Sequence, residues 1–346
     1  MSNQDYSPNG NGKLQTYGNA HFRVRCEFNP QGRLSQKIEN SAHFRDIYEY
    51  AHDFKGHLVR VIRNNKLVEE YGYNDKGQRI KQYAPHDPPA EYLKYNPKGQ
   101  VTNLRDTEWQ YDHNGATVKK LVSALYGAGG RQTRYHYGMD ARLDKAIMPS
   151  GDEITYSYPE GKGFKTQNPV RKYKNGRLSA QYEWFDPTKL SVCKDYEQKM
   201  LFLFAYDRNQ HLSKLRIMQF DGKHYMDFLC GCDQVGTPKL ITLPNGKLLK
   251  MMKYDSFGNI LSDTKPEIHI PVGFAGGLHD RDTGLIRFGY RDYDPTIGRF
   301  LCPDPLGDRR GDGDLYDYCV DDPVSANDAN GLFWAGVGKR VIWNVE

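Results

Sequence analysis

Apolar or aromatic residues and polar residues alternate in many short stretches of the chain. Residues 67–73 and 153–158 are examples, and in the second an apolar or aromatic side chain occupies every other position. Side chains of a β-strand point alternately to its two faces, so this period of two predicts strands with one buried face. Helical periodicity is sparse. The pattern therefore predicts an all-β chain.

A repeated motif separates these stretches: an aromatic residue, then Asn or Asp, two variable residues and Gly. Clear copies begin at Phe28, Tyr73, Tyr95, Tyr111 and Tyr254, and degenerate copies begin at Tyr50, Tyr206 and Cys232. From Phe28 to Tyr111 the spacings are 22, 23, 22 and 16 residues, and Cys232 precedes Tyr254 by 22. A period near 22 fits two short strands with their turns. The Asn or Asp side chain can bond the backbone two residues on, and Gly supplies a positive φ.

The repeat also predicts how the hairpins assemble. A single hairpin cannot bury its own face, so successive hairpins must stack edge to edge into a long curling sheet. We assign residues 1–18 to a flexible N-terminus, 19–262 to the repeat sheet, 272–332 to a separate domain and 333–346 to a short tail. An irregular β-domain with tyrosine-rich turns remains the alternative.

Composition narrows the class of protein. The chain has 25 Tyr, 15 Phe, 4 Trp and 34 Gly, and this aromatic content argues against disorder. The net charge of +5 comes from 48 basic and 43 acidic residues without a basic run, so we expect no nucleic-acid partner. No stretch approaches the roughly 20 apolar residues of a membrane-spanning helix. The six cysteines are scattered and only Cys230 and Cys232 form a C-x-C, so we expect no metal site, and the chain lacks cofactor motifs.

Residues 272–332 carry several closely spaced motifs in a fixed order. They include Arg291-Asp292-Tyr293-Asp294, then Pro303-Asp304-Pro305, and finally Asp328-Ala329-Asn330-Gly331-Leu332. This series closely resembles the RHS repeat-associated core domain of bacterial RHS proteins, of the C subunits of Tc toxins and, more distantly, of teneurins. The upstream repeats are similar to YD repeats, which extends the resemblance over nearly the whole chain.

The resemblance implies an architecture and a role. YD-repeat hairpins would form a curled sheet or partial shell, capped by the RHS core domain and enclosing or presenting a C-terminal toxin segment. Expected partners are that toxin cargo, an immunity protein or chaperone, and a shell-completing protein or a second copy. The N-terminus has no Sec signal, so we expect synthesis in the cytoplasm followed by a dedicated secretion system or attachment to the cell surface, as in bacterial competition.

The resemblance also implies a single-turnover self-cleavage after Leu332, at the Leu332–Phe333 bond. The matching catalytic positions are Asp292 and Asp304 with Arg291, and Asp328, Asn330 and Gly331 belong to the cleavage motif. Two adjacent carboxyl groups can hydrolyse a peptide bond when one is ionised and activates water while the other donates a proton. A nearby arginine can stabilise the developing oxyanion.

Two departures from the family pattern bear on this activity. Ala329 stands where the family usually has proline, and losing a rigid turn is expected to slow cleavage. Only residues 333–346 follow the cut, whereas a folded toxin domain needs on the order of 50 residues. Two alternatives therefore stay open: a scaffold in which the Asp and Arg residues form an ion-pair network, and a surface module whose tyrosines stack on glycans.

Overall fold

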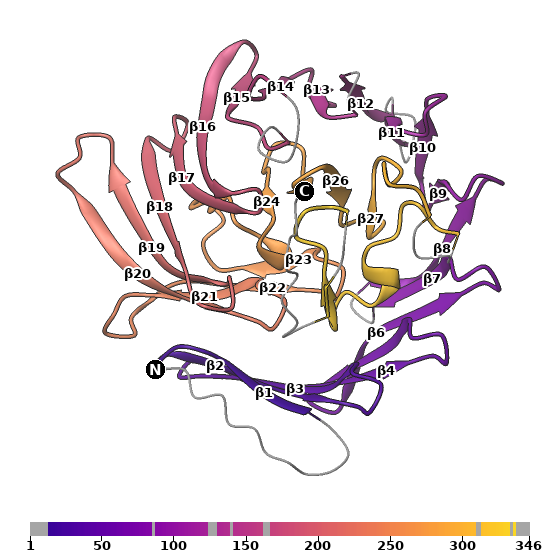
Figure 1. Ribbon diagram of the computed structural model, residues 1–346, viewed down its shortest axis with the longest axis horizontal. Coiled ribbons are helices and arrows are strands. Elements are labelled where there is room, and N and C mark those ends of the chain that lie inside the picture. The colour runs from indigo at the N-terminus through magenta and orange to yellow at the C-terminus, as the bar shows by residue number, and fades with distance from the viewer. Residues whose placement is uncertain are drawn as a thin grey trace.

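The computed structural model describes residues 13–84, 87–123, 130–138, 141–161, 167–308, 313–332 and 335–336. Within these residues, 23 strands form one antiparallel sheet, followed by a four-stranded and a two-stranded sheet (Figure 1). The expectation of an all-β fold built from a curled sheet is confirmed. No helix in the described ranges is long and apolar enough to cross a membrane.

The large sheet runs through the following strands in chain order: β1 (Lys13–Gly18), β2 (Phe22–Phe28), β3 (Leu34–Ser41), β4 (Arg45–His52), β5 (Leu58–Arg63), β6 (Lys66–Tyr73), β7 (Arg79–Ala84), β8 (Asp87–Tyr95), β9 (Val101–Leu104), β10 (Thr107–Tyr111), β11 (Thr117–Val122), β12 (Arg131–Tyr137), β13 (Leu143–Ile147), β14 (Glu153–Ser157), β15 (Arg171–Lys174), β16 (Arg177–Asp186), β17 (Lys189–Asp195), β18 (Met200–Tyr206), β19 (Leu212–Gln219), β20 (Tyr225–Cys232), β21 (Pro238–Thr242), β22 (Leu248–Tyr254) and β23 (Ile260–Asp263). The C-terminal part contains η3 (Phe274–Gly276), β24 (Leu278–His279), β25 (Ile286–Phe288), β26 (Arg291–Asp294), β27 (Arg299–Phe300), η4 (Cys319–Asp321), β28 (Ala326–Asn327) and β29 (Ala335–Gly336).

Every strand of the large sheet pairs with its neighbours in sequence, as in β1 with β2 and β22 with β23. In the described part of the chain, β1 pairs only with β2 and β23 only with β22, so the sheet curls without closing on itself. The sheet begins at Lys13, inside the segment that the sequence assigned to a flexible N-terminus. It ends at Asp263, next to the predicted boundary.

The turns between hairpins have the geometry that the motif predicts. In the copy that begins at Tyr73, the Asn74 side-chain oxygen accepts hydrogen bonds from the backbone N–H groups of Lys76 and Gln78, both at 3.0 Å. Gly77 has a φ of +83°. The copy at Asn96 repeats the same two bonds. Local turn chemistry therefore sets the hairpin repeat.

The beginning of the sheet lies against its end, and we call this contact the overlap: strands β1–β6 packed on β20–β22 and on the turn that follows β22 (Figure 1). The Asn19 amide donates to the Cys230 carbonyl at 3.0 Å, and Lys253 pairs with Asp46 at 3.4 Å. Side chains, rather than strand pairing, hold the two layers together.

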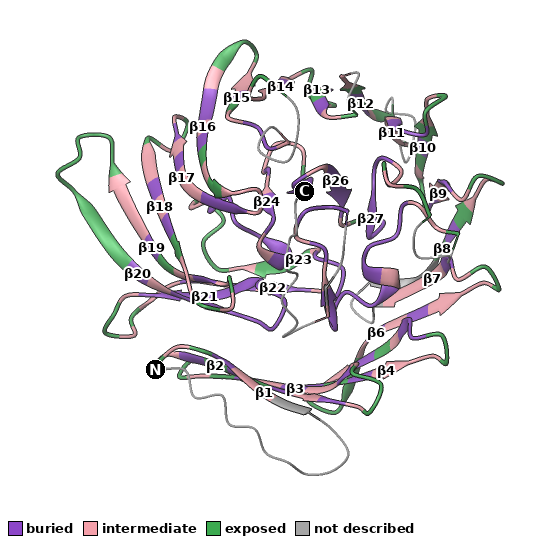
Figure 2. Cartoon of the chain, in the orientation of Figure 1, coloured by how far each residue is buried: buried purple, intermediate pink, exposed green. Residues whose placement is uncertain are grey.

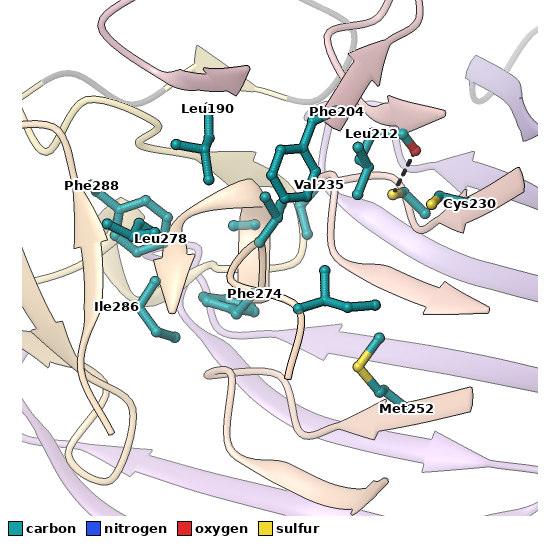
Figure 3. Close-up of a cluster of buried hydrophobic side chains, with 14 of the residues drawn as sticks. Leu190, Phe204, Leu212, Cys230, Val235, Met252, Phe274, Leu278, Ile286 and Phe288 are labelled. Carbon is teal, nitrogen blue, oxygen red and sulfur yellow. Dashed lines mark hydrogen bonds between the residues drawn. The ribbon is translucent and has the colours of Figure 1, made fainter. Parts of the chain in front are cut away.

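The C-terminal domain fills the inside of the curl (Figure 1). Its aromatic residues cluster together, for example Phe274 with Tyr293 and Phe288 with Tyr318. The same hydrophobic cluster includes residues of the large sheet, which we call the wall, such as Phe204 on β18, so the domain and the wall share one core (Figure 3). Burial is concentrated in this interior, whereas several hairpin ends are exposed (Figure 2). The sequence resemblance predicted a domain that caps the sheet, whereas in the structure this domain lies inside the curl and supports the wall from within.

Candidate active site

Strand β26 places Arg291 and Asp292 on its opposite faces, because consecutive side chains of a strand alternate. Both side chains are buried, with 3% of Arg291 and 8% of Asp292 exposed. The two residues that the sequence placed in one catalytic group therefore have different neighbours.

Arg291 lies between two carboxylates. Its Nη2 atom is 3.1 Å from Asp304 Oδ2 and 3.4 Å from Asp328 Oδ2. Its guanidinium carbon stacks 3.6 Å from the centre of the Phe300 ring. Asp328 is completely buried, whereas the Asp304 side chain keeps 11% of its surface exposed. A single guanidinium nitrogen thus bridges one carboxylate that reaches solvent and one that does not.

The predicted cleavage motif is part of the same cluster. Arg291 Nε donates to the Gly331 carbonyl at 2.5 Å. The Leu332 N–H donates to Asp328 Oδ1 at 3.0 Å and to Asn330 Oδ1 at 3.1 Å, and Leu332 is buried. The predicted scissile bond begins at Leu332, and its other residue, Phe333, lies outside the described residues.

Asp292 makes a different ion pair. Its Oδ2 atom is 2.5 Å from Arg287 Nη1. Burial raises the pKa of Asp292, and the nearby Arg287 opposes that rise. The structure therefore brings together Arg291, Asp304 and the cleavage motif, and it pairs Asp292 with Arg287.

Sequence reasoning assigned Asp328 to the cleavage motif and not to the charged group. The signal that could have indicated its second role is its position: a carboxylate four residues before the bond to be cut can reach that bond through a tight turn. Gly331 supports such a turn with a φ of +70°, and its N–H donates to the Asp328 carbonyl at 3.3 Å.

This cluster has the groups that acid–base hydrolysis needs: two carboxyls, a fixed cation and a peptide segment held by backbone hydrogen bonds. Among the described residues, no three His, Cys, Asp or Glu side chains group as metal ligands. The Cys230 and Cys232 thiols are buried, and burial raises the pKa of each. The C-x-C pair thus packs in the core as apolar thiols.

The aromatic residues bear on the glycan-binding alternative. Tyr71, Tyr135 and Tyr182 are each less than 9% exposed and pack in the interior clusters. Some rings are strongly exposed, as Phe54 at 91% between β4 and β5 and Tyr92 at 62% within β8. Glycan stacking needs tyrosine rows that face solvent, and these three tyrosines do not supply them.

Comparison with known sequences links the chain to one family. A family model described as the teneurin YD-shell matches residues 5–317. Teneurin-3 of Danio rerio is 26% identical over 316 residues, which cover 88% of this chain and 11% of that protein. Teneurin-4 of Homo sapiens is 27% identical over 287 residues, which cover 82% of this chain and 10% of that protein. The chain thus spans about a tenth of the length of these relatives.

Solved structures of Tc toxins share the fold. A Photorhabdus luminescens Tc holotoxin pore with a mutation in TccC3 matches with a TM-score of 0.50 at 14% identity, over 99% of this chain and 19% of that one. The crystal structure of TcdB2-TccC3-TEV matches with a TM-score of 0.50 at 15% identity, over 93% of this chain and 20% of that one. At such identities the likeness shows the fold alone.

Proposed function

The chain belongs to the teneurin YD-shell family, and from this premise we propose that its shell scaffold holds its own C-terminal segment and cuts it after Leu332. The shell-type fold is shared with the Tc toxin structures. What we propose beyond the fold is that the shell holds the C-terminal segment, cuts it and encloses a toxin cargo.

One observation carries the proposal: Arg291 contacts Asp304, Asp328 and the Gly331 carbonyl at once, one residue before the bond to be cut. The sequence resemblance proposed Asp292 as the second carboxyl group. We now propose Asp328 in that role, because Asp328 shares Arg291 with Asp304.

The chemistry is hydrolysis of the Leu332–Phe333 peptide bond. Asp304 reaches solvent and takes a proton from a water molecule, whose oxygen adds to the Leu332 carbonyl carbon. Oδ1 of Asp328 accepts the Leu332 N–H, so in the reacting form the proton is on Oδ2, which donates it to the carbonyl oxygen, and Arg291 stabilises the negative charge that develops there. The C–N bond then breaks as Asp304 passes the proton that it took from water to the Phe333 nitrogen. A hydroxyl proton of the intermediate returns to Asp328, and Leu332 ends in a new carboxyl group.

The scaffold role explains why the cut chain would stay in place. After the motif, the chain returns and Ala335–Gly336 of β29 pairs with Ala326–Asn327 of β28. We propose that the segment remains against the core domain until a partner or a change of conditions releases it. The wider roles follow the same proposal: a cargo beyond this segment, a shell-completing partner, an immunity protein or chaperone, and cytoplasmic synthesis before dedicated export.

The first prediction tests the cleavage directly by intact mass of the purified full-length chain. We expect the wild type to lose residues 333–346, and Asp304→Asn and Asp328→Asn to stay whole because each lacks one of the two carboxyl groups. Asp304→Glu, which keeps the carboxyl, serves as the matched control and should retain some cleavage. A wild-type chain that stays whole after prolonged incubation from pH 4 to 8 would overturn the proposal in favour of a non-catalytic scaffold.

A further inference from the structure

We propose that Asp292 and Arg287 form a positioning pair, which holds the Gly289 turn against Asn330 and Gly331 and so sets the cleavage motif against Arg291. The inference rests on the proposed self-cleavage and gives a role to a carboxylate that the reaction itself does not use.

Arg287 joins three segments of the chain. Its Nη1 atom pairs with Asp292 on β26 at 2.5 Å, and its Nε donates to the Gly289 carbonyl at 2.7 Å. Its Nη2 donates to the carbonyl of Gln167 in the wall at 2.9 Å. A planar guanidinium with all three nitrogens engaged fixes orientation as well as distance. The turn between β25 and β26 is therefore tied to both the strand and the wall.

This turn is in direct contact with the cleavage motif. The Tyr290 N–H donates to the Asn330 carbonyl at 2.9 Å. A Cβ atom on Gly289 would lie 2.6 Å from that same carbonyl oxygen, and one on Gly331 would lie 2.4 Å from the Phe288 oxygen. Both glycines have positive φ, +47° and +70°. The two turns interlock at a distance that only glycine permits.

Arg291 connects this turn to the cleavage motif a second time. The residue follows the Gly289 turn directly, and its Nε bonds the Gly331 carbonyl. Loosening the Gly289 turn would therefore move the motif and Arg291 relative to each other. A misplacement of about 1 Å can slow a reaction about a hundred-fold without removing any reacting group. Asp292 bonds Arg287 and would affect cleavage only through Arg287. It is therefore a positioning residue and not a catalytic one.

The test uses Asp292→Asn and Arg287→Lys in the full-length chain. Arg287→Lys keeps the positive charge but cannot make all three hydrogen bonds in the planar geometry of arginine. It therefore separates the effect of orientation on cleavage from the effect of charge. Lys120→Met is the matched control, because it breaks the 2.8 Å pair with Asp294 on the same strand without touching the Gly289 turn. Intact mass gives the cleavage rate at several pH values. Hydrogen exchange, measured in the uncut Asp304→Asn background, follows the amides of residues 326–332.

We expect cleavage in both variants to slow about ten- to hundred-fold, at the same bond and with an unchanged pH profile. Exchange should rise in residues 326–332 while the amides of β18 and β19 exchange as before, and Lys120→Met should change neither readout. Undiminished cleavage, a shifted pH profile or faster exchange throughout the sheet would each overturn the positioning role. If the wild type is never cut, the proposed function fails, while the exchange measurement still decides whether Asp292 and Arg287 hold the motif.

Discussion

At the scale of single residues, the overlap contains two carboxyl groups from distant parts of the chain, and one raises the pKa of the other. Glu69 Oε2 accepts hydrogen bonds from the Tyr71 hydroxyl at 2.7 Å and from the Ser256 N–H at 3.1 Å. Burial and the nearby Glu69 raise the pKa of Asp255 to about 7, although hydrogen bonds from Asn259 and the charge of Arg79 oppose the rise. The sequence assigned Asp255 only to a turn. Its electrostatic partner lies 186 residues away and no local pattern indicates it.

Glu69 and Asp255 together make the stability of the fold depend on pH. The folded chain holds a proton on Asp255 up to about pH 7, whereas the unfolded chain releases it near 3.8, so rising pH between these values reduces stability. Glu69→Gln removes the like charge and should weaken this loss. The free energy of unfolding of the variant, relative to wild type, should be larger at pH 8 than at pH 5 by on the order of 1 kcal/mol.

Urea unfolding at the two pH values measures this difference. Burial lowers the pKa of His269 to about 3, which also makes stability depend on pH. This effect is common to the wild type and the variant, so it cancels when the two are compared. A variant that differs from wild type equally at pH 5 and pH 8 would contradict the prediction.

At the scale of elements, the repeat motif does more than make turns. The tyrosine hydroxyl donates to a backbone carbonyl in the preceding repeat: Tyr73 to Leu58 at 2.8 Å and Tyr95 to Arg79 at 2.7 Å. The sequence predicted the hairpins and their turns from local chemistry. It did not predict this bond between repeats, because the bond depends on which carbonyl the neighbouring hairpin brings within reach.

We therefore predict that Tyr95→Phe destabilises the chain by about 1 kcal/mol, since it leaves the Arg79 carbonyl without this donor. Tyr254→Phe is the matched control, because the Tyr254 hydroxyl contacts the Met252 sulfur at 3.5 Å and not a carbonyl. Thermal unfolding at one pH compares the two variants. Equal losses of stability in both would mean that the hydroxyl bond between repeats contributes nothing.

The C-terminal domain has elements that no sequence pattern indicated. Cys319, Val320 and Asp321 in η4 all have positive φ, at 56°, 54° and 51°. Such backbone is unfavourable for side chains with a Cβ, above all for a branched one such as Val320. The surrounding core holds it, with Cys319 and Asp321 both buried. Tertiary packing overrides local preference in this segment.

At the scale of the whole molecule, one close contact fixes how the start of the sheet lies on its end. A Cβ atom on Gly231 of β20 would lie 2.5 Å from the Cβ of Phe22 on β2. Phe22 is 1% exposed and belongs to the hydrophobic cluster of the overlap. The missing side chain at residue 231 thus lets the two layers meet.

Gly231→Ala should accordingly destabilise the chain by about 1–3 kcal/mol, because the added methyl group overpacks a closed contact. The double variant with Phe22→Leu should recover part of the loss, since the two changes share one contact. Urea unfolding measures the stability, and X-ray scattering should show a larger radius of gyration for the single variant. Gly72→Ala is the control, because its added Cβ would lie 3.2 Å from the Lys81 Cβ, a less severe contact than the 2.5 Å at Gly231. Full additivity of the two changes would refute this account of the overlap.

The sequence by itself determined the strands, the turns and their order, because each hairpin is built from residues a few positions apart. It also determined the motifs of the candidate site, including Arg291, Asp304 and the segment from Asp328 to Leu332. Only the tertiary structure decided that Asp328 meets Arg291 while Asp292 turns to Arg287, and that the C-terminal domain sits inside the curl. These contacts join residues far apart in the chain, and they depend on strand face and layer packing, which no local pattern specifies.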